Sequence, residues 1–213
     1  MSEALSDSVG TFAELVGAGT PTPGGGSVAA YSGVLAAALG QMMCNLTIGK
    51  AKYLEVEPRV KEIKADLERL GARLRELIAE DANSFESVLV AYRQPKETDE
   101  QKVERKRRID IATRGAVDVP LETAQRALEV LQRLADLAKI GNPNALPDVT
   151  VGSRLAETAV KGAYYNIGIN LKTLADRTAA GIIERQTTEL IIETERLAAE
   201  IESTMLKQME SDG

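Results

Sequence analysis

The sequence predicts an all-α protein, a single domain built as an antiparallel, bundle-like array of about six or seven helices. Ala, Leu, Glu, Arg and Lys dominate the composition, whereas aromatic residues make up 3% and Trp is absent. This balance is typical of helical proteins. Apolar residues recur at steps of three and four, and no stretch of useful length alternates apolar with polar residues. At 213 residues we expect one domain over residues 1–213.

The first half of the chain predicts three helices. Apolar positions from Val9 to Val16 predict a short helix over about residues 6–16. Small apolar residues over about 28–50 predict a central helix that other helices approach closely. Its ~30 Å length also suits a membrane span, but polar interruptions and abundant Ala and Gly predict a buried helix and no membrane partner. Pro58 is expected to open a long helix that Pro95 ends.

A further helix is expected to start at a capping box formed by Thr98 and Gln101. Its first turns carry a basic cluster over residues 102–108, which we interpret as a solvated face balanced by neighbouring Glu residues. Pro120 is expected to break or kink this helix, with a new helix over about residues 121–139.

The last part of the chain predicts two helices after an irregular loop at 141–147. Asp148 is expected to cap the first, which extends towards Leu174. The second covers about residues 182–209 and carries apolar residues at heptad spacing from Ile183 to Leu197. This stripe is expected to pack either along the bundle or against a second subunit.

Composition also excludes several classes of function. The net charge of −6 argues against a general nucleic-acid binder. The chain has no His and one Cys, Cys44, so a zinc site of the His/Cys type is excluded and Cys44 is expected to be an inert core thiol. The polar, acidic start predicts no signal peptide, and a reducing cytoplasm is the expected compartment. Acid–base chemistry would fall to carboxylates, lysines or tyrosines.

A proline- and glycine-rich turn from Thr20 to Ser27 precedes the central helix. Its three consecutive glycines allow unusual backbone angles or a close approach to another surface, and Ser27 is expected to cap the helix. A helix N-terminus of this kind suits a carboxylate or phosphate. The alternative is a tight loop into a core helix, and the turn matches neither a dinucleotide fingerprint nor a P-loop.

Asp81 is the acid most expected to have a special role, because it lies in a mostly apolar segment between Ile78 and Phe85. Acids seldom enter an apolar face unpaired. Such an Asp is either a structural hydrogen-bond anchor or a catalytic carboxylate with a tuned pKa. Lys50 and Lys52 follow the central helix, where they either offset its negative pole, or one of them reaches a ligand carboxylate or delivers a proton.

Several sequence blocks together resemble the cyclodeaminase/cyclohydrolase family of folate enzymes. That family includes the C-terminal domain of formiminotransferase-cyclodeaminase and stand-alone methenyltetrahydrofolate cyclohydrolases. The blocks fall in the family's order over about residues 10–176, and the last ~35 residues carry no motif. They are the glycine turn at 20–27, residues 45–53, 81–85, 95–98, 119–120, 141–144 with Asp148, and 166–170.

The resemblance implies a tetrahydrofolate pocket built from the glycine turn and the polar ends of several helices. Its implied reaction is the reversible hydrolysis of 5,10-methenyltetrahydrofolate to 10-formyltetrahydrofolate, with no metal and no cofactor beyond the tetrahydrofolate substrate. The alternatives are cyclodeaminase activity on 5-formiminotetrahydrofolate, which expels ammonia, and a non-catalytic folate-binding helical protein. Members of that family form dimers, so the resemblance implies a homodimer.

The resemblance also assigns residues to roles. The catalytic candidates are Asp81, Asp148 and Lys50. The substrate-binding candidates are Pro23, Gly24, Gly25, Gly26, Ser27, Asn45, Lys52, Asn142, Asn144, Asn166 and Asn170. For the inward-facing amides, hydrogen bonding between helices is an equally good interpretation. The chain departs from the family pattern at Ala51, where a third lysine is frequent, and at Ala145 and Pro147, where hydroxyl residues are common.

Overall fold

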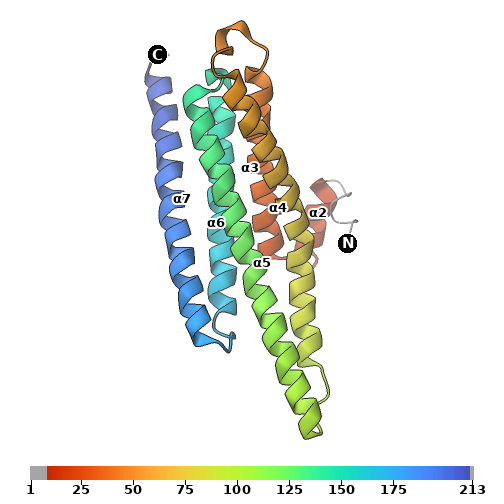
Figure 1. Ribbon diagram of the computed structural model, residues 1–213. Helices are drawn as coiled ribbons and strands as arrows, with labels where there is room; N and C mark the ends of the chain where they lie inside the picture. Colours follow the sequence, from red (N-terminus) through yellow and green to blue (C-terminus); the bar gives the residue numbers. More distant parts are fainter. Residues whose placement is uncertain (1–8, 212–213) are drawn as a thin grey trace.

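The structure is a computed structural model that describes residues 9–211. Within that range the chain forms six α-helices and two short 3-10 helices and no strand, which confirms the predicted all-α class. The helices are α2 (Val9–Gly17), α3 (Gly25–Thr47), α4 (Glu57–Tyr92), α5 (Asp99–Ile140), α6 (Leu146–Asn170) and α7 (Arg177–Ser211), with η1 (Ala51–Tyr53) and η2 (Pro143–Ala145) between them. Figure 1 shows α3 to α7 running alternately up and down, with the α4–α5 hairpin extending beyond the other helices.

Helix α3 lies against α4 and α6 and also touches α5, as expected for a helix of small residues. Gly40 illustrates why the residues are small, because a Cβ there would come within 2.7 Å of methyl groups of both Leu67 and Leu134. The fully buried side chains around α3 are mainly leucines of α4 and α5, among them Leu74 and Leu131. Cys44 is buried in this core, as predicted, and burial raises the pKa of its thiol to about 11, which favours the protonated, unreactive form.

Several local signals act as the sequence predicts. Pro58 stands in the first turn of α4, and α4 ends at Tyr92, three residues before Pro95. Thr98 caps α5: its hydroxyl accepts a hydrogen bond from the Gln101 N–H at 3.3 Å, and the Thr98 N–H donates to the Gln101 side chain at 3.1 Å. Each of these signals lies within four residues of the feature it controls.

The predicted break at Pro120 is wrong, because α5 continues unbroken from Asp99 to Ile140. A proline lacks the N–H that would bind the carbonyl four residues earlier, which here is Ala116. The side-chain amide of Asn170, at the end of α6, donates a 2.6 Å hydrogen bond to that carbonyl. A partner from a neighbouring helix therefore replaces the missing bond, and the helix continues.

Two predicted helix caps are also wrong. Helix α3 begins earlier than expected, at Gly25, so its cap is Gly24 and Ser27 stands inside the first turn. Helix α6 begins at Leu146 with Ala145 as its cap, so Asp148 lies in the first turn rather than before it. In both cases the chain turns into the helix two or three residues before the best capping residue, which frees that side chain for other contacts.

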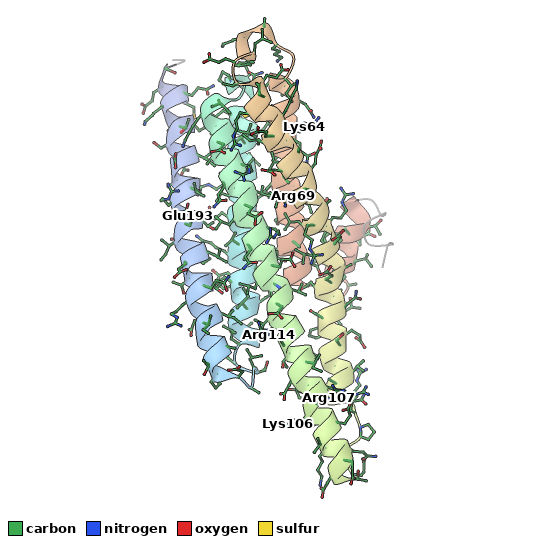
Figure 2. All side chains as sticks on the ribbon, in the orientation of Figure 1. Lys64, Arg69, Lys106, Arg107, Arg114 and Glu193 are labelled. Atoms are coloured by element: carbon green, nitrogen blue, oxygen red, sulfur yellow. The ribbon has the colours of Figure 1, made fainter. Side chains whose placement is uncertain are left out.

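Helix α7 covers the bundle on one side, packed on α5 and α6. Its heptad stripe is buried within the chain at Ile183, Leu197 and Ile201, so of the two expectations the stripe packs along the bundle. On the solvent side, charged side chains such as Lys64, Arg114 and Glu193 cover the surface (Figure 2). The basic cluster at the start of α5 is balanced as expected, because Arg107 and Arg108 both bind Glu104.

Among the described helices, α3 alone is long and apolar enough to cross a membrane by length and composition, and just over half of that stretch is buried against other helices.

Candidate functional site

The glycine turn and Asp81 meet at the start of α3, although 54 residues separate Ser27 from Asp81 in the sequence. The Ser27 hydroxyl donates a 2.9 Å hydrogen bond to Oδ2 of Asp81. Asp81, on α4, is thus joined by a side-chain hydrogen bond to the first turn of α3.

Gly26 is what lets the carboxylate come so close. A Cβ at this position would overlap Oδ1 of Asp81 and would lie 2.6 Å from its Cγ. Gly25, the neighbouring residue, has far more room, since the nearest heavy atom to its Cβ position is Nδ2 of Asn166 at 3.9 Å. The predicted close approach of the glycine turn to another surface therefore belongs to Gly26, and that surface is Asp81.

Two opposing effects act on the Asp81 carboxylate. Burial favours the neutral form and raises the pKa of Asp81 above its ordinary value of 3.8, while the hydrogen bonds from Ser27 favour the anion and limit that rise. The unpaired N–H groups at the start of α3 add a favourable field for a negative charge. The result is a half-buried carboxylate that is more basic than an exposed aspartate and is fixed in orientation.

The same contact also gives Asp81 a structural role, because it ties α4 to the first turn of α3, which Gly24 caps without a side-chain hydrogen bond. The sequence left a structural anchor and a catalytic base as alternatives, and the geometry contains the requirements of both. A carboxylate that serves only as a structural anchor does not need to be reachable from solvent. Here Gly25, which adjoins the Ser27–Asp81 pair, is exposed to solvent.

Of the other candidates, Pro23, Gly24 and Gly25 lie in the turn beside the Ser27–Asp81 pair, and Asn166 adjoins Gly25. The side-chain amide of Asn166 donates one 2.9 Å hydrogen bond to the carbonyl of Gly162 in its own helix. Asn170 has a different task, since its amide binds the Ala116 carbonyl on α5. We call the group of Gly24, Gly25, Gly26, Ser27, Asp81 and Asn166 the Asp81 site.

The remaining candidates lie at the opposite end of α3. They are Asn45, Lys50, Lys52, Asn142, Asn144 and Asp148. Helix α3 spans 23 residues, which at 1.5 Å per residue places its ends ~33 Å apart. A folate that carries a single glutamate is shorter than this, so within one chain the structure does not bring the candidates together in one pocket.

Asn142 organises this second group, which we call the Lys50 end. Its backbone N–H donates to the Thr47 hydroxyl at 3.0 Å, and its side-chain amide donates to the Leu46 carbonyl at 3.1 Å. Its side-chain oxygen accepts hydrogen bonds from the Tyr53 hydroxyl at 3.3 Å and the Asn144 N–H at 3.1 Å. Asn142 therefore closes the C-terminus of α3. The hydrogen bonds of Thr47 and Tyr53 with Asn142 were not predicted from the sequence, although both residues lie in the block at 45–53 that resembles the family.

Lys50 and Lys52 are exposed at this end, and neither forms a salt bridge with any described residue. The Lys52 ammonium lies 5.5 Å from the centre of the Tyr53 ring, within the range of a cation–π contact. Asn45 and Asn144 are also exposed, and Asp148 is half-buried. The Lys50 end thus presents two cations to solvent beside fixed amides.

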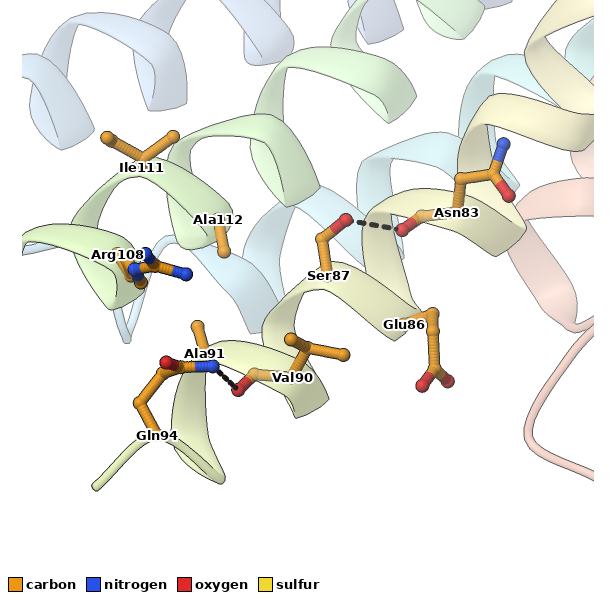
Figure 3. Close-up of a pocket in the computed structure, with 9 residues that line it drawn as sticks. All are labelled: Asn83, Glu86, Ser87, Val90, Ala91, Gln94, Arg108, Ile111 and Ala112. Atoms are coloured by element: carbon orange, nitrogen blue, oxygen red, sulfur yellow. Dashed lines mark hydrogen bonds between the residues drawn. The ribbon is translucent and has the colours of Figure 1, made fainter. Parts of the chain in front are cut away.

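A groove of about 460 Å³ runs between α4 and α5 near the tip of their hairpin (Figure 3). Its lining residues are Asn83, Glu86, Ser87, Val90, Ala91, Gln94, Arg108, Ile111 and Ala112. Val90 follows Asp81 by nine residues, which is about half a turn out of phase on a helix of 3.6 residues per turn. The groove therefore lies on the other side of α4 and contains none of the predicted site residues. Over residues 9–211, no group of three or more Cys, Asp or Glu side chains is placed to hold a metal ion.

Comparison with known proteins agrees with these observations. The model of the formiminotransferase-cyclodeaminase family matches residues 8–189. A methenyltetrahydrofolate cyclohydrolase from Methylorubrum extorquens is 38% identical over 200 residues, covering 94% of this chain and 96% of that protein. The formimidoyltransferase-cyclodeaminase of Rattus norvegicus is 33% identical over 195 residues, but there the chain spans 36% of the longer protein.

A solved structure, described as formiminotetrahydrofolate cyclodeaminase from Thermotoga maritima, superimposes with a TM-score of 0.86 at 26% identity. The match covers 96% of this chain and 98% of the other. The similarity thus extends over the whole helical array, from α3 with its glycine turn to α7. The chain belongs to the formiminotransferase-cyclodeaminase family.

Proposed function

We propose that this protein hydrolyses 5,10-methenyltetrahydrofolate to 10-formyltetrahydrofolate. The observation that carries the proposal is the full-length similarity to the Methylorubrum extorquens protein, which bears the name of that activity and leaves only 4% of its own length unmatched. The Asp81 site supports it, because hydrolysis of a cationic carbon needs an anionic base held in a fixed position.

The chemistry follows from the substrate's amidinium-like carbon between N5 and N10. The Asp81 carboxylate stabilises this cation and accepts one proton from the water whose oxygen attacks the carbon. The carbinolamine that forms then loses its hydroxyl proton as its carbonyl develops and the C–N5 bond breaks, and N5 takes up a proton. One proton is released overall. Water addition to a carbon that already carries positive charge involves no change of oxidation state, so no redox cofactor or metal is proposed.

A second candidate is cyclodeaminase activity on 5-formiminotetrahydrofolate. It is favoured by the Thermotoga maritima structure, whose description carries that activity and whose helices superimpose throughout. Both reactions pass through a tetrahedral carbon between N5 and a second nitrogen, and the same carboxylate suits both. The non-catalytic alternative has less support, because the relatives are named as enzymes.

The proposal has a direct assay. The purified protein is expected to accelerate the loss of methenyltetrahydrofolate absorbance well above the buffer rate, and to release little ammonia from formiminotetrahydrofolate. The reverse pattern would replace the first candidate by the second. If neither substrate reacts faster than in buffer and the protein still binds tetrahydrofolate in a titration, the protein is the non-catalytic folate-binding alternative.

Other properties are proposed with the activity. We place the protein in the cytoplasm, with no nucleic-acid or membrane partner, because its substrate is a soluble small molecule and its net charge is −6. Helix α3 is then a bundle helix rather than a span, consistent with its packing on α4 and α6. We also propose a homodimer, for which light scattering should give twice the 22.9 kDa chain mass.

A further inference from the structure

The Ser27 hydroxyl has two acceptors on α4. Its oxygen lies 2.9 Å from Oδ2 of Asp81 and 3.3 Å from the backbone carbonyl oxygen of Ile78, about one turn earlier on the same helix. A hydroxyl has a single hydrogen, so it donates fully to only one of these acceptors at a time. Ser27 is 0% exposed, and a side chain without exposed surface does not touch a ligand. Although Ser27 was expected to bind substrate, its hydroxyl therefore acts through these two neighbours.

The charge of Asp81 decides which acceptor the hydroxyl serves. Hydrogen bonds to an ionised group are about twice as strong as those between neutral groups. While Asp81 is ionised, the hydroxyl hydrogen therefore points towards Oδ2. Once Asp81 holds a proton this advantage is lost, and the carbonyl of Ile78 becomes the better acceptor. The change requires only a rotation of the hydroxyl hydrogen about its C–O bond, with no movement of either helix.

The second acceptor matters because Ser27 is buried. A buried donor without a good acceptor destabilises the protein, and a protonated carboxyl group accepts only weakly. If Asp81 were the only partner of the hydroxyl, this cost would oppose the uptake of a proton by Asp81. The Ile78 carbonyl removes the cost, because it offers the hydroxyl an acceptor in that state. In the proposed hydrolysis Asp81 gains a proton from the attacking water and loses it again in each turnover, while Ser27 keeps its own hydrogen throughout.

The described surroundings of Asp81 contain no charged group that would replace this control. Burial raises the pKa of Asp81 and Ser27 lowers it, and no charged side chain of another described element shifts it. On the neighbouring helices, Gly26 of α3 and Asn166 of α6 are uncharged. On α4 the preceding acid, Glu80, is bound by an arginine of the same helix. The hydroxyl of Ser27 is therefore the group whose removal should change the behaviour of this carboxylate most clearly.

We propose that Ser27 is a positioning residue for the reaction, whose hydroxyl orients Asp81 while the carboxylate is ionised and turns to the Ile78 carbonyl while Asp81 holds a proton. The catalytic part of this inference rests on the proposed function. The rotation of the hydroxyl does not, because it follows from the two distances and the burial of Ser27 alone.

Kinetics of Ser27→Ala test the catalytic part. The value of kcat should fall on the order of tenfold, because the carboxylate is no longer held in one orientation. KM should stay within about twofold, because Ser27 does not touch the substrate. The acid limb of kcat/KM should move to higher pH by about one unit, because the anion has lost a hydrogen-bond donor. A raised KM with unchanged kcat would show a substrate contact and overturn the proposal.

Ser153→Ala is a matched control for this substitution. Ser153 is also 0% exposed, but its hydroxyl donates to the Thr150 carbonyl of its own helix at 2.8 Å. It should leave kcat, KM and the acid limb as in wild type. If Ser27→Ala also left all three unchanged and lowered only the melting temperature, Ser27 would be purely structural and the proposal would be wrong.

Carbon-13 NMR of the protein without substrate tests the state of the carboxylate directly. Comparison with Asp81→Asn identifies the carboxyl signal of Asp81. The midpoint of its titration should lie at higher pH in Ser27→Ala than in wild type, and should not move in Ser153→Ala. An unchanged midpoint in Ser27→Ala would overturn the proposal.

The same spectra test the rotation of the hydroxyl. As Asp81 takes up its proton in the wild-type protein, the backbone carbonyl of Ile78 gains a donor, so its signal should shift with the same midpoint. In Ser27→Ala only the part of the shift that is transmitted along α4 should remain. Equal shifts in the two proteins would overturn the rotation. The expected shifts in a protein that does not hydrolyse methenyltetrahydrofolate would support the rotation and count against the proposed function alone.

Discussion

The side chain of Asn170 binds the backbone carbonyl of Ala116, and that carbonyl is the one that Pro120 leaves without its helical partner. Three residues on two helices thus form one structural unit. Two blocks of family resemblance, at 119–120 and 166–170, meet in this single hydrogen bond. Asn170 was expected to bind substrate, and its position here gives it a sufficient structural reason to be an asparagine.

The first prediction concerns this unit. Asn170→Ala should lower the free energy of unfolding by about 1 kcal/mol or more, because it leaves the half-buried Ala116 carbonyl without its partner. Pro120→Ala restores the N–H that binds Ala116, so in that background Asn170→Ala should cost clearly less. A double-mutant cycle measured by urea unfolding checks the coupling. Equal costs in both backgrounds would show that the amide has another task, such as ligand contact.

The second prediction concerns the Asp81 carboxylate. Asp81→Asn keeps the size of the side chain but removes its charge and its basicity, so kcat/KM should fall ~10²-fold or more, equivalent to about 2.7 kcal/mol of transition-state stabilisation. Asp66→Asn is a matched control, because Asp66 lies on the same helix and binds Arg69 and Arg133 on the surface. Its activity should stay within about twofold of wild type. A purely structural Asp81 would reverse the pattern, with a lower melting temperature and nearly normal turnover.

The third prediction is a pH dependence with a defined sign. Because burial raises the pKa of Asp81, kcat/KM should fall as the pH drops through a value above 3.8, where the base becomes protonated. The folded state holds this proton more tightly than the unfolded state does. The contribution of Asp81 to stability is therefore greatest below pH 3.8 and is lost as the pH rises through its folded pKa.

Two measurements on Asp81→Asn check these signs. Its residual activity should lack the acid limb of the wild-type profile. Its melting temperature, relative to wild type, should improve as the pH rises through the same window, because the wild-type protein alone bears the cost of a buried charge there. An acid limb unchanged by the substitution would assign it to another group.

The fourth prediction separates two adjacent glycines. Gly26→Ala places a methyl group where Asp81 now lies, so the carboxylate must move away from Ser27, and activity should fall ~10-fold or more through loss of positioning. At Gly25 an added Cβ would have Nδ2 of Asn166 as its nearest neighbour, at 3.9 Å, so Gly25→Ala should leave the Ser27–Asp81 hydrogen bond in place and cost less activity than Gly26→Ala. Steady-state kinetics and thermal melting of the two variants test this difference. Similar losses of activity in both variants would show that the turn depends on the backbone freedom of its glycines rather than on the contact between Gly26 and Asp81.

The sequence predicted those features that depend on neighbouring residues. Thr98 with Gln101, and Pro58, each mark a helix start correctly because the groups they bind or replace are a few residues away. The inward direction of Asp81 also followed from its apolar neighbours, and the contact with Ser27 confirms it.

The errors at Pro120 and Ser27 share one physical cause, which is a contact from a distant part of the chain. Pro120 does not break α5 because Asn170 is supplied by α6. Ser27 does not cap α3 because its hydroxyl binds Asp81 on α4. The division of the candidate site into two groups could not be predicted either. A sequence gives the order of its motifs along the chain, but not the ~33 Å of helix α3 that separates the glycine turn from the Lys50 end.

Gly40 and its two leucine neighbours have a consequence for how the chain evolves. The methyl groups of Leu67 and Leu134 occupy the space that a side chain at position 40 would need. A mutation that enlarges position 40 is thus harmful in this background and harmless after one of the leucines has become smaller. We expect relatives that carry a larger residue here to carry a shorter one at position 67 or 134, and the order in which those changes arose to be constrained.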